Sequence, residues 1–328
     1  MANIENVLVL LPVTEDHKKL LEQEAPSASF VYSSSEEATH QMVQSADIII
    51  GNPPPEMVMG SVKIKWLQLG SAGTGHYVKS GILPSGTLLT NATGAYGLAV
   101  SEYMIGVLLE LYKKLHLYRD NQQRNLWQVE GSVRSIYGST VLIVGLGDIG
   151  GEFAKRIHAL GGYTIGVRRA DSTKPDYVDE LILMDMLDTA LPRADVVAMS
   201  LPGTKETNRL FSKERLDNMK PGAVLINVGR GSVLDTDALC DALESGHIAG
   251  AALDVTDPEP LPADHRIWQI KNAIITPHVS GGYHLPETFE RIIRISAGNL
   301  RRFISNQRLI NLVDFSTGYR EAPNLPHP

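Results

Sequence analysis

Short apolar segments alternate with amphipathic segments along most of this chain. The apolar segments have the length and composition of buried strands, and they occupy residues 6–11, 46–50, 65–70, 139–147, 163–168, 194–201, 222–229, 248–255 and 272–278. Strands of this kind, alternating with helices, are typical of parallel sheets covered on both faces. The pattern therefore predicts the α/β fold class.

Two longer segments with helical periodicity predict connections between two lobes. Apolar residues recur at helical spacing over residues 101–118 and again over residues 287–305, as they do in helices that cover a core. We expect residues 1–100 and 291–328 to form one discontinuous lobe, with residues 101–290 inserted as a second lobe. Both lobes are expected to be Rossmann-like, each with a parallel sheet.

The composition excludes several classes of partner. Of the 328 residues 43% are hydrophobic, the formal net charge is -7, and the basic residues are scattered, so neither nucleic acid nor an anionic membrane is expected to bind. No apolar run approaches the ~20 residues that span a bilayer, and the N-terminus does not resemble a signal peptide, so we expect a cytoplasmic protein. The single cysteine, Cys240, lies in a helical pattern and is expected to be a buried apolar residue. The histidines lack the spacing of metal ligands, so no metal is expected.

A glycine motif follows the apolar segment at residues 139–144. In "STVLIVGLGDIGGEFAKRIHALGG" the glycines are Gly145, Gly147 and Gly150, with Asp148 and Ile149 before the third. The first glycine permits a tight turn, the second lets the backbone approach a pyrophosphate, and the third lets strand and helix pack closely. Glycine turns are common, but this strand-to-helix context predicts a dinucleotide site.

The next strand-like segment ends in two arginines rather than an acid. In "YTIGVRR" the residues at its end are Arg168 and Arg169, where a protein that prefers NAD(H) would offer a carboxylate to the ribose hydroxyls. A guanidinium can bind a 2′-phosphate bidentately. We therefore expect NADP(H) to be favoured and NAD(H) to be possible; the alternative is that both arginines face solvent.

Three ionisable residues each follow a later apolar strand. They are Arg230 in "INVGRGSVLD", Glu259 in "LDVTDPEPLP" and His278 in "NAIITPHVSGG". Loops after parallel strands gather along one sheet edge, so we expect the three residues to converge. A guanidinium, a carboxylate and an imidazole suit the reduction of a 2-oxo acid, which brings a carboxylate and a carbonyl oxygen that must gain a proton.

These segments resemble the D-isomer-specific 2-hydroxyacid dehydrogenase family. The resemblance rests on "GLGDIG", "ADVVAMSLPGTKETNRLF", "KPGAVLINVGRGSVLD", "LDVTDPEPLP" and "TPHVSGG" in this order, and it covers nearly the whole chain. It implies that Arg230, Glu259 and His278 are catalytic, that Asp254 lies near the nicotinamide amide, and that Pro202 belongs to the cofactor site. It also implies two lobes that close over a small 2-oxo or 2-hydroxy acid, and a homodimer formed through the cofactor lobes.

The expected mechanism assigns one task to each of these three side chains. His278 is the general acid in reduction and the general base in oxidation, with reduction expected to dominate. Glu259 orients the ring and favours the imidazolium form of His278. The positive charge of Arg230 opposes this effect, so the sequence leaves open which protonation state of the ring is favoured overall. Arg230 binds the substrate carboxylate and polarises the carbonyl group.

The first lobe contributes a loop of small residues, "WLQLGSAGTGHY". Backbone N–H groups at Ser71, Ala72 and Gly73 can form an anion nest, and the resemblance implies that they bind the substrate carboxylate. The chain departs from the family near Gly75, where many relatives have an aspartate, and this leaves the conformation of the loop open. Tyr96 is a candidate to approach the substrate pocket.

Several related functions stay open. Glu259 disfavours formate dehydrogenases, which carry glutamine there, and the chain length disfavours a phosphoglycerate dehydrogenase with a regulatory domain, although not a short form. Phosphite oxidation and a cofactor-sensing corepressor or scaffold on the same fold are further alternatives. The segments "GVRR" and "VDFSTGY" are most similar to glyoxylate and hydroxypyruvate reductases, while bulkier 2-oxo acids stay possible.

Overall fold

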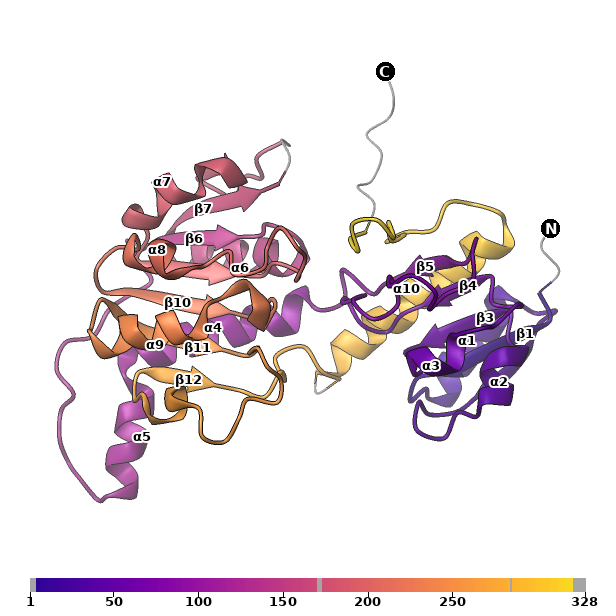
Figure 1. Ribbon diagram of the computed structural model, residues 1–328, viewed down its shortest axis with the longest axis horizontal. Coiled ribbons are helices and arrows are strands. Elements are labelled where there is room, and N and C mark those ends of the chain that lie inside the picture. The colour runs from indigo at the N-terminus through magenta and orange to yellow at the C-terminus, as the bar shows by residue number, and fades with distance from the viewer. Residues whose placement is uncertain (1–3, 170–172, 284, 321–328) are drawn as a thin grey trace. The chain divides into compact units, whose positions relative to one another are not determined.

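The computed structural model describes residues 4–169, 173–283 and 285–320, and it divides into two compact units. The first unit comprises Met1–Tyr96 and Tyr283–Pro328, and the second comprises Gly97–Gly282 (Figure 1). The predicted boundaries at 100/101 and 290/291 differ from these by four and eight residues. The reason is that each boundary falls just before a long helix begins, whereas the prediction placed it inside the helical pattern. Residues 170–172, which follow Arg169, lie outside the described part of the chain.

The sheet of the first unit has five parallel strands in the order β2-β1-β3-β4-β5. This order reverses direction between β1 and β3, and ligands of doubly wound folds bind beyond the strand ends at such a point. The strands are β1 (Asn6–Leu10), β2 (Ser29–Tyr32), β3 (Ile48–Gly51), β4 (Trp66–Gln68) and β5 (Leu88–Thr90). The helices are α1 (Glu15–Glu24), α2 (His40–Ser45), α3 (Pro55–Val58) and α10 (Pro286–Ile304).

Helix α10 belongs to the first unit although it lies almost 200 residues after β5. Its Phe303 ring stacks on Trp66 of β4 with centroids 5.4 Å apart. The buried Asn299 amide donates to Gln68 Oε1 at 2.9 Å and to the Ile310 carbonyl at 3.0 Å. These contacts account for the return of the C-terminal segment to the first unit, which the periodicity over 287–305 predicts.

The sheet of the second unit has seven parallel strands in the order β12-β11-β10-β9-β6-β7-β8. The order reverses between β6 and β9, so this unit is a doubly wound fold with a ligand-binding point beyond those two strands. The strands are β6 (Thr140–Val144), β7 (Tyr163–Arg168), β8 (Glu180–Leu183), β9 (Val196–Met199), β10 (Ala223–Asn227), β11 (Ile248–Leu253) and β12 (Ala273–Ile275). The predicted α/β class with parallel sheets is confirmed.

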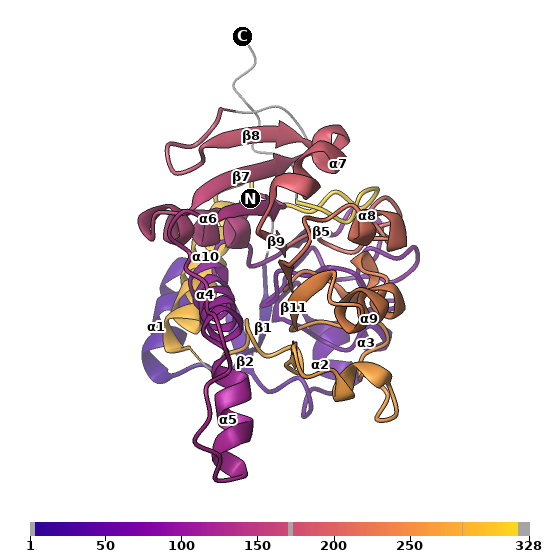
Figure 2. The same ribbon diagram turned by 90° about the vertical axis from the view of Figure 1, so that its left-hand side faces the viewer.

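Helices cover both faces of this sheet. Figure 2 shows α4 (Gly97–Lys113) and α6 (Asp148–Ala159) on one face, with α8 (Lys213–Asp217) and α9 (Thr236–Glu244) on the other. The short helix α7 (Leu187–Ala190) follows β8 in this unit. Cys240 is buried in α9, and burial raises the pKa of its thiol to about 11. A buried thiol that stays protonated at neutral pH behaves as a small apolar side chain.

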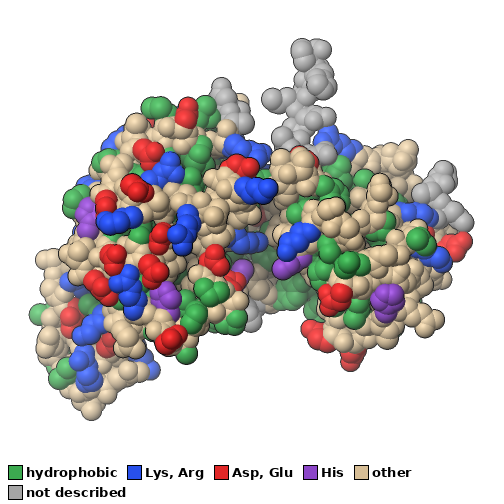
Figure 3. Space-filling model, viewed as in Figure 1, with side chains coloured by type: hydrophobic (Ala, Val, Ile, Leu, Met, Phe, Trp, Pro, Cys, Tyr) green, Lys and Arg blue, Asp and Glu red, His purple; other side chains and the backbone are tan. Residues whose placement is uncertain are grey.

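The helix predicted over residues 101–118 is two helices. Helix α4 ends at Lys113, Lys114 has a left-handed backbone with φ of 58°, and α5 (Leu115–Gln123) continues in a new direction. Figure 2 shows α5 extending away from the sheet. On the face shown in Figure 3, acidic and basic side chains are interspersed over the second unit. Among the described residues, no helix combines the length and apolar character needed to cross a membrane.

Candidate active site

The glycine motif forms the turn between β6 and α6. Gly145 has φ of +100°, a conformation that favours glycine. A Cβ atom on Gly150 would lie 2.1 Å from the Gly145 carbonyl oxygen, so the third glycine is required by close packing. A Cβ on Gly147 would meet no protein atom within 4 Å, and this residue is exposed. The backbone is thus open where a pyrophosphate would approach the N-terminus of a 12-residue helix.

The two residues between the second and third glycines have different surroundings. Asp148 opens α6, and its Oδ2 accepts a hydrogen bond of 3.0 Å from the N–H of Gly97, the first residue of α4. Ile149 is half-buried. The glycine turn is therefore joined to the beginning of α4.

The loop after β9 lies beside this turn. The Ser200 hydroxyl donates to the Gly145 carbonyl at 2.7 Å, and Pro202 follows two residues later, its carbonyl accepting from the Thr207 hydroxyl at 2.7 Å. This is the edge at which the strand order reverses. The segment that leads to Pro202 therefore contacts Gly145 through Ser200.

Arg168 is the last residue of β7, and Arg169 follows it. Arg168 is half-buried, whereas Arg169 is exposed. The pKa of Glu206, in the loop after β9, is lowered by a hydrogen bond with Thr204 and, to a smaller extent, by the charges of Lys205 and Arg169. Arg169 therefore lies close enough to that loop for its charge to act on Glu206.

Arg230 follows β10 in a tightly held loop. Its flanking glycines are required by contact, because Cβ atoms would lie 2.3 Å from the Leu201 carbonyl oxygen at Gly229 and 1.9 Å from the Thr256 carbonyl carbon at Gly231. The buried Asn227 side chain accepts from the Gly229 N–H and donates to the Arg230 carbonyl, both at 3.0 Å. Burial lowers the pKa of Arg230, against a raising effect of Glu259. A guanidinium has no acidic pKa near neutrality, so this group stays charged in a partly dehydrated place.

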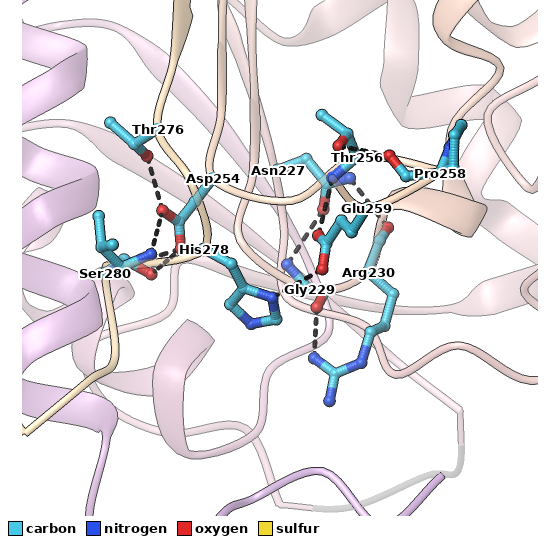
Figure 4. A network of polar contacts seen from close by, with 11 residues as sticks. Asn227, Gly229, Arg230, Asp254, Thr256, Pro258, Glu259, Thr276, His278 and Ser280 are labelled. Atoms are coloured by element: carbon cyan, nitrogen blue, oxygen red, sulfur yellow. Dashed lines mark hydrogen bonds and ion pairs between the residues drawn. The ribbon is translucent and has the colours of Figure 1, made fainter. Parts of the chain in front are cut away.

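Glu259 and His278 form a hydrogen-bonded pair on the loops after β11 and β12. Glu259 Oε2 lies 3.0 Å from His278 Nδ1, and Glu259 Oε1 accepts from the Thr256 N–H at 3.0 Å (Figure 4). An ionised carboxylate only accepts, so Nδ1 carries a proton and Nε2 is the atom left to face a ligand. Arg230 lies close enough for its charge to interact with Glu259. The structure thus brings the three predicted catalytic residues together.

Asp254 stands at the base of the His278 loop. It is 1% exposed, and its carboxylate accepts from the hydroxyl groups of Thr276 and Ser280 and from the backbone N–H groups of Val279 and Ser280. Figure 4 shows these bonds joining Asp254 to residues on either side of His278. The predicted place of Asp254 beside a nicotinamide amide stays a prediction.

The loop of small residues in the first unit follows β4. Its carbonyl groups are all bound within the unit: those of Gly70, Ser71, Ala72 and Gly73 accept from Tyr96 Oη, Ala92 N, Asn91 Nδ2 and Ser71 Oγ. In the described part of the chain, the N–H groups of Ser71, Ala72 and Gly73 have no hydrogen-bond acceptor. A loop with bound carbonyls and available N–H groups attracts an anion.

Asn52 and Tyr96 hold this loop in place. Asn52, just beyond β3, accepts from the Gly70 N–H and donates to Ser71 Oγ, both at 3.0 Å. Tyr96 is buried, and its hydroxyl donates a hydrogen bond to the Gly70 carbonyl at 2.5 Å. Near Gly75, where the family's aspartate is missing, the Thr74 hydroxyl donates to the Gly318 carbonyl at 2.7 Å. The loop is therefore fixed by other residues.

Sequence reasoning missed three residues that position this chemistry: Asn52, Asn227 and Thr276. Asn52 directly follows the apolar strand β3, and Asn227 is the last residue of β10. These positions are the only signal that the sequence offers for the two residues. No group of three or more His, Cys, Asp or Glu side chains suited to a metal occurs among the described residues.

Comparisons with known proteins identify the family. Residues 105–280 match the family model described as D-isomer specific 2-hydroxyacid dehydrogenase, NAD binding domain. A glyoxylate reductase of Thermofilum pendens is 33% identical over 256 residues, covering 75% of this chain and 73% of that protein. A D-3-phosphoglycerate dehydrogenase of Methanocaldococcus jannaschii is 27% identical over 98% of this chain and 60% of its own length.

A solved structure of similar fold supports the same conclusion. The D-isomer specific 2-hydroxyacid dehydrogenase family protein from Aeromonas salmonicida superposes with a TM-score of 0.84 at 32% identity, covering 95% of this chain and all of that one. The resemblance found in the motifs is thereby confirmed. This chain belongs to the D-isomer specific 2-hydroxyacid dehydrogenase family and is an NAD(P)-dependent oxidoreductase.

Proposed function

We propose that this protein reduces a small 2-oxo acid of the glyoxylate or hydroxypyruvate kind to the D-2-hydroxy acid, with NADPH as the preferred reductant. The observation that carries the proposal is the Glu259–His278 pair at 3.0 Å beside the half-buried Arg230. It supplies a proton donor and a carboxylate-binding cation on adjoining loops of one unit. Catalytic roles for these three residues are part of the proposal.

Each side chain has one task in the proposed reduction. Arg230 binds the substrate carboxylate, and its charge stabilises the negative charge that develops on the carbonyl oxygen. His278 holds a proton on Nε2 and transfers it to that oxygen, so that a C–H and an O–H bond replace the C=O double bond. Glu259 keeps Nδ1 hydrogen-bonded and thereby fixes the ring orientation. A bound nicotinamide cofactor supplies the hydride.

The cofactor fits the glycine turn of the second unit. Gly145, Gly147, Asp148, Ile149 and Gly150 present the N-terminus of α6, and the backbone at Gly147 is open to a pyrophosphate. Pro202 and Asp254 are proposed to lie along the same bound cofactor.

The preference for NADPH rests on Arg168 and Arg169 at the end of β7. The matched family model is that of an NAD binding domain, so the two arginines carry this part of the proposal alone. A guanidinium fork can hold a 2′-phosphate, which a carboxylate at the same place would repel.

The loop of Ser71, Ala72 and Gly73 is proposed to bind the substrate carboxylate through its backbone. Its three available N–H groups support this assignment, and the bonds from Asn52 and Asn91 keep the loop rigid. Tyr96 supports the loop from beneath, because its hydroxyl is bound to Gly70.

Oxidation of the reduced cofactor with a panel of acids tests the proposal. Purified protein is given NADPH or NADH and, in turn, glyoxylate, hydroxypyruvate, 3-phosphohydroxypyruvate, phenylpyruvate and 2-oxoisocaproate. We expect the highest kcat/KM with NADPH and one of the first two acids. If neither cofactor is oxidised with any of the acids, although NADPH binding is measurable by fluorescence, the proposed reaction is contradicted and the corepressor alternative is favoured.

We further propose a homodimer formed through the second unit. Helix α5 and the segment after it expose several large apolar side chains, namely Leu115, Leu126, Trp127, Val129, Val133 and Tyr137. Trp127 is fully exposed. Monomeric proteins rarely expose apolar side chains in such a group, so a second copy of the chain is the proposed occupant.

Light scattering tests the dimer. The wild type is expected at twice the chain mass, and the double variant Trp127→Asp/Val129→Asp at the mass of one chain. The matched control is Val62→Asp, which alters an equally exposed residue of the first unit and should leave the dimer intact. A monomeric wild type would contradict this part of the proposal.

The cytoplasmic location stays a prediction.

A further inference from the structure

His278 holds an unusual backbone conformation. Its φ is +52°, in the left-handed region that residues other than glycine seldom adopt. Its N–H donates to the carbonyl oxygens of Asp254 at 2.8 Å and Thr276 at 3.0 Å. Such a conformation persists only where surrounding contacts enforce it.

The Asp254 carboxylate supplies that enforcement and uses all of its acceptor capacity to do so. Oδ1 accepts from Thr276 Oγ1 at 2.6 Å and from the Val279 N–H at 2.9 Å, while Oδ2 accepts from both the N–H and the hydroxyl of Ser280. An ionised carboxylate offers about four lone-pair sites, and here four donors from one loop fill them. This buried carboxylate therefore clamps the loop on both sides of His278.

A tyrosine on a different element completes the clamp. Tyr103 of α4 has its hydroxyl 2.7 Å from Thr276 Oγ1. Because the single Thr276 proton is given to Asp254, the proton shared with Tyr103 must come from the tyrosine. Burial raises the pKa of Tyr103 to about 12, so its hydroxyl is a donor throughout the neutral range. Tyr103 thus donates a hydrogen bond to Thr276, and Thr276 donates one to Asp254.

We propose that Tyr103 is a positioning residue for His278, acting through Thr276 and Asp254. Its hydrogen bond fixes the rotamer in which Thr276 donates to Asp254, and the filled carboxylate keeps His278 Nδ1 aimed at Glu259. Without the tyrosine hydroxyl, Thr276 can turn away and one acceptor site of Asp254 loses its donor. Tyr103 lies outside every motif by which the chain resembles its family. The inference rests on the proposed function only for its kinetic consequence.

The test compares Tyr103→Phe with a matched control on the same helix. The control is Tyr112→Phe, which removes the hydroxyl of the other tyrosine of α4; Tyr112 is buried, and its hydrogen-bond partner is Ser139 Oγ at 3.4 Å. Steady-state kinetics give kcat and KM for each variant, and a titration gives its NADPH dissociation constant. The exchange of backbone amide hydrogens at residues 278–280 is measured as well.

We expect Tyr103→Phe to lower kcat by about fivefold to tenfold, the effect of one hydrogen bond, with the NADPH dissociation constant unchanged. Amide exchange at Val279 and Ser280 should be faster, while Tyr112→Phe should resemble the wild type in both measurements. Thr276→Ser keeps the hydroxyl and should stay near wild-type kcat, whereas Thr276→Val should lower it. Adding Tyr103→Phe to Thr276→Val should cause no further loss, because both act through one chain of bonds.

Equal behaviour of the Tyr103→Phe and Tyr112→Phe variants would overturn the inference, as would a loss confined to NADPH affinity. If Tyr103→Phe does not fold, the Thr276→Ser and Thr276→Val pair decides by the same criteria. If the wild type turns over no oxo acid, the proposed function fails and amide exchange alone decides. Faster exchange at residues 278–280 in Tyr103→Phe than in Tyr112→Phe then supports the positioning role, and equal exchange overturns it.

Discussion

Glu259 Oε2 lies 3.0 Å from His278 Nδ1, and this bond selects Nε2 as the ring atom that can exchange a proton with a ligand. Both side chains are partly exposed, as a pair must be if it is to meet a substrate. Neither residue lies within a regular element: each is held on a loop beyond the C-terminal end of a strand, Glu259 after β11 and His278 after β12. The chemistry of the site follows from that placement.

Replacing His278 should therefore abolish most turnover without removing the cofactor. We expect His278→Gln to lower kcat by about 10²- to 10⁴-fold, the usual contribution of a general acid. Glu259→Gln should give an intermediate loss, since an amide oxygen can still accept from Nδ1 but carries no charge. Steady-state kinetics and NADPH fluorescence titration measure the two effects separately. Near-normal turnover of His278→Gln would remove this histidine from the mechanism.

Arg168→Asp should reverse the coenzyme preference. Loss of a charged hydrogen bond to the 2′-phosphate is expected to lower the ratio of kcat/KM with NADPH to that with NADH by about 10- to 100-fold. Arg302→Asp is the matched control, because it makes the same charge change on α10 of the first unit. If the ratio of kcat/KM with NADPH to kcat/KM with NADH is unchanged in Arg168→Asp, Arg168 does not bind the 2′-phosphate.

The two glycines of the cofactor turn should respond differently to alanine. Gly150→Ala places a Cβ atom 2.1 Å from the Gly145 carbonyl oxygen, so we expect unfolding free energy to fall by about 1–3 kcal/mol, as in overpacked cores. Gly147→Ala meets no protein atom within 4 Å, so its stability should equal that of the wild type while NADPH affinity falls. Chemical denaturation and fluorescence titration distinguish the two. Undiminished NADPH affinity in Gly147→Ala would place the pyrophosphate elsewhere.

Asp47 should make the first unit sensitive to acid. Its buried carboxylate accepts from the Glu5 and Asn6 N–H groups at 2.9 and 3.1 Å and pairs with Lys65 at 2.7 Å. Burial acts to raise the pKa of Asp47, but these bonds outweigh it and the pKa is lowered. A lowered folded-state pKa gives stability that is present above the unfolded-state pKa and is lost as the pH falls through the folded-state value.

The Asp47→Asn variant tests this linkage by denaturation at several pH values. We expect a loss of about 1–3 kcal/mol near neutral pH, because two backbone N–H groups and Lys65 lose a charged acceptor, and a smaller difference from the wild type in acid. Asp16→Asn, on the exposed side of α1, should change little at any pH. A constant difference between Asp47→Asn and wild type from neutral pH to below about 4 would contradict the account.

The central strands and the edge strand β12 could be predicted from sequence, whereas the edge strands β2, β5 and β8 could not. β7 coincides with its apolar segment because both of its faces are buried. β2 and β8 lie at sheet edges, where none of their side chains is buried, and β5 has only three residues. Such strands carry too few apolar positions to stand out from loops.

The helix break at Lys114 shows a second limit. Lysine favours helices, so the residues around Lys114 do not predict its left-handed backbone conformation. Its ammonium group instead donates to the Glu130 carbonyl, 16 residues away. Tertiary contacts of this kind decide where a helix ends, and a local pattern cannot contain them.

The candidate site divides in the same way. Arg230, Glu259 and His278 could be predicted because each follows an apolar strand and lies in a motif that resembles the family. Asn52 could not, because its role depends on Gly70 and Ser71 lying beside the end of β3 in the folded sheet. Polar residues that position others become visible only once the loops are arranged in space.

The most direct test of the central claim follows hydride into the product. Wild-type protein and the His278→Gln variant are given glyoxylate or hydroxypyruvate together with NADPH deuterated at the transferable position of the nicotinamide, and the hydroxy acid is analysed by mass spectrometry and chiral chromatography. We expect the wild type to form product that carries deuterium on its hydroxyl-bearing carbon, as the D-isomer where that carbon also carries a substituent, while the variant forms almost none. Product without deuterium, or equal amounts from both proteins, would contradict the assignment of this site to hydride transfer with His278 as the proton donor.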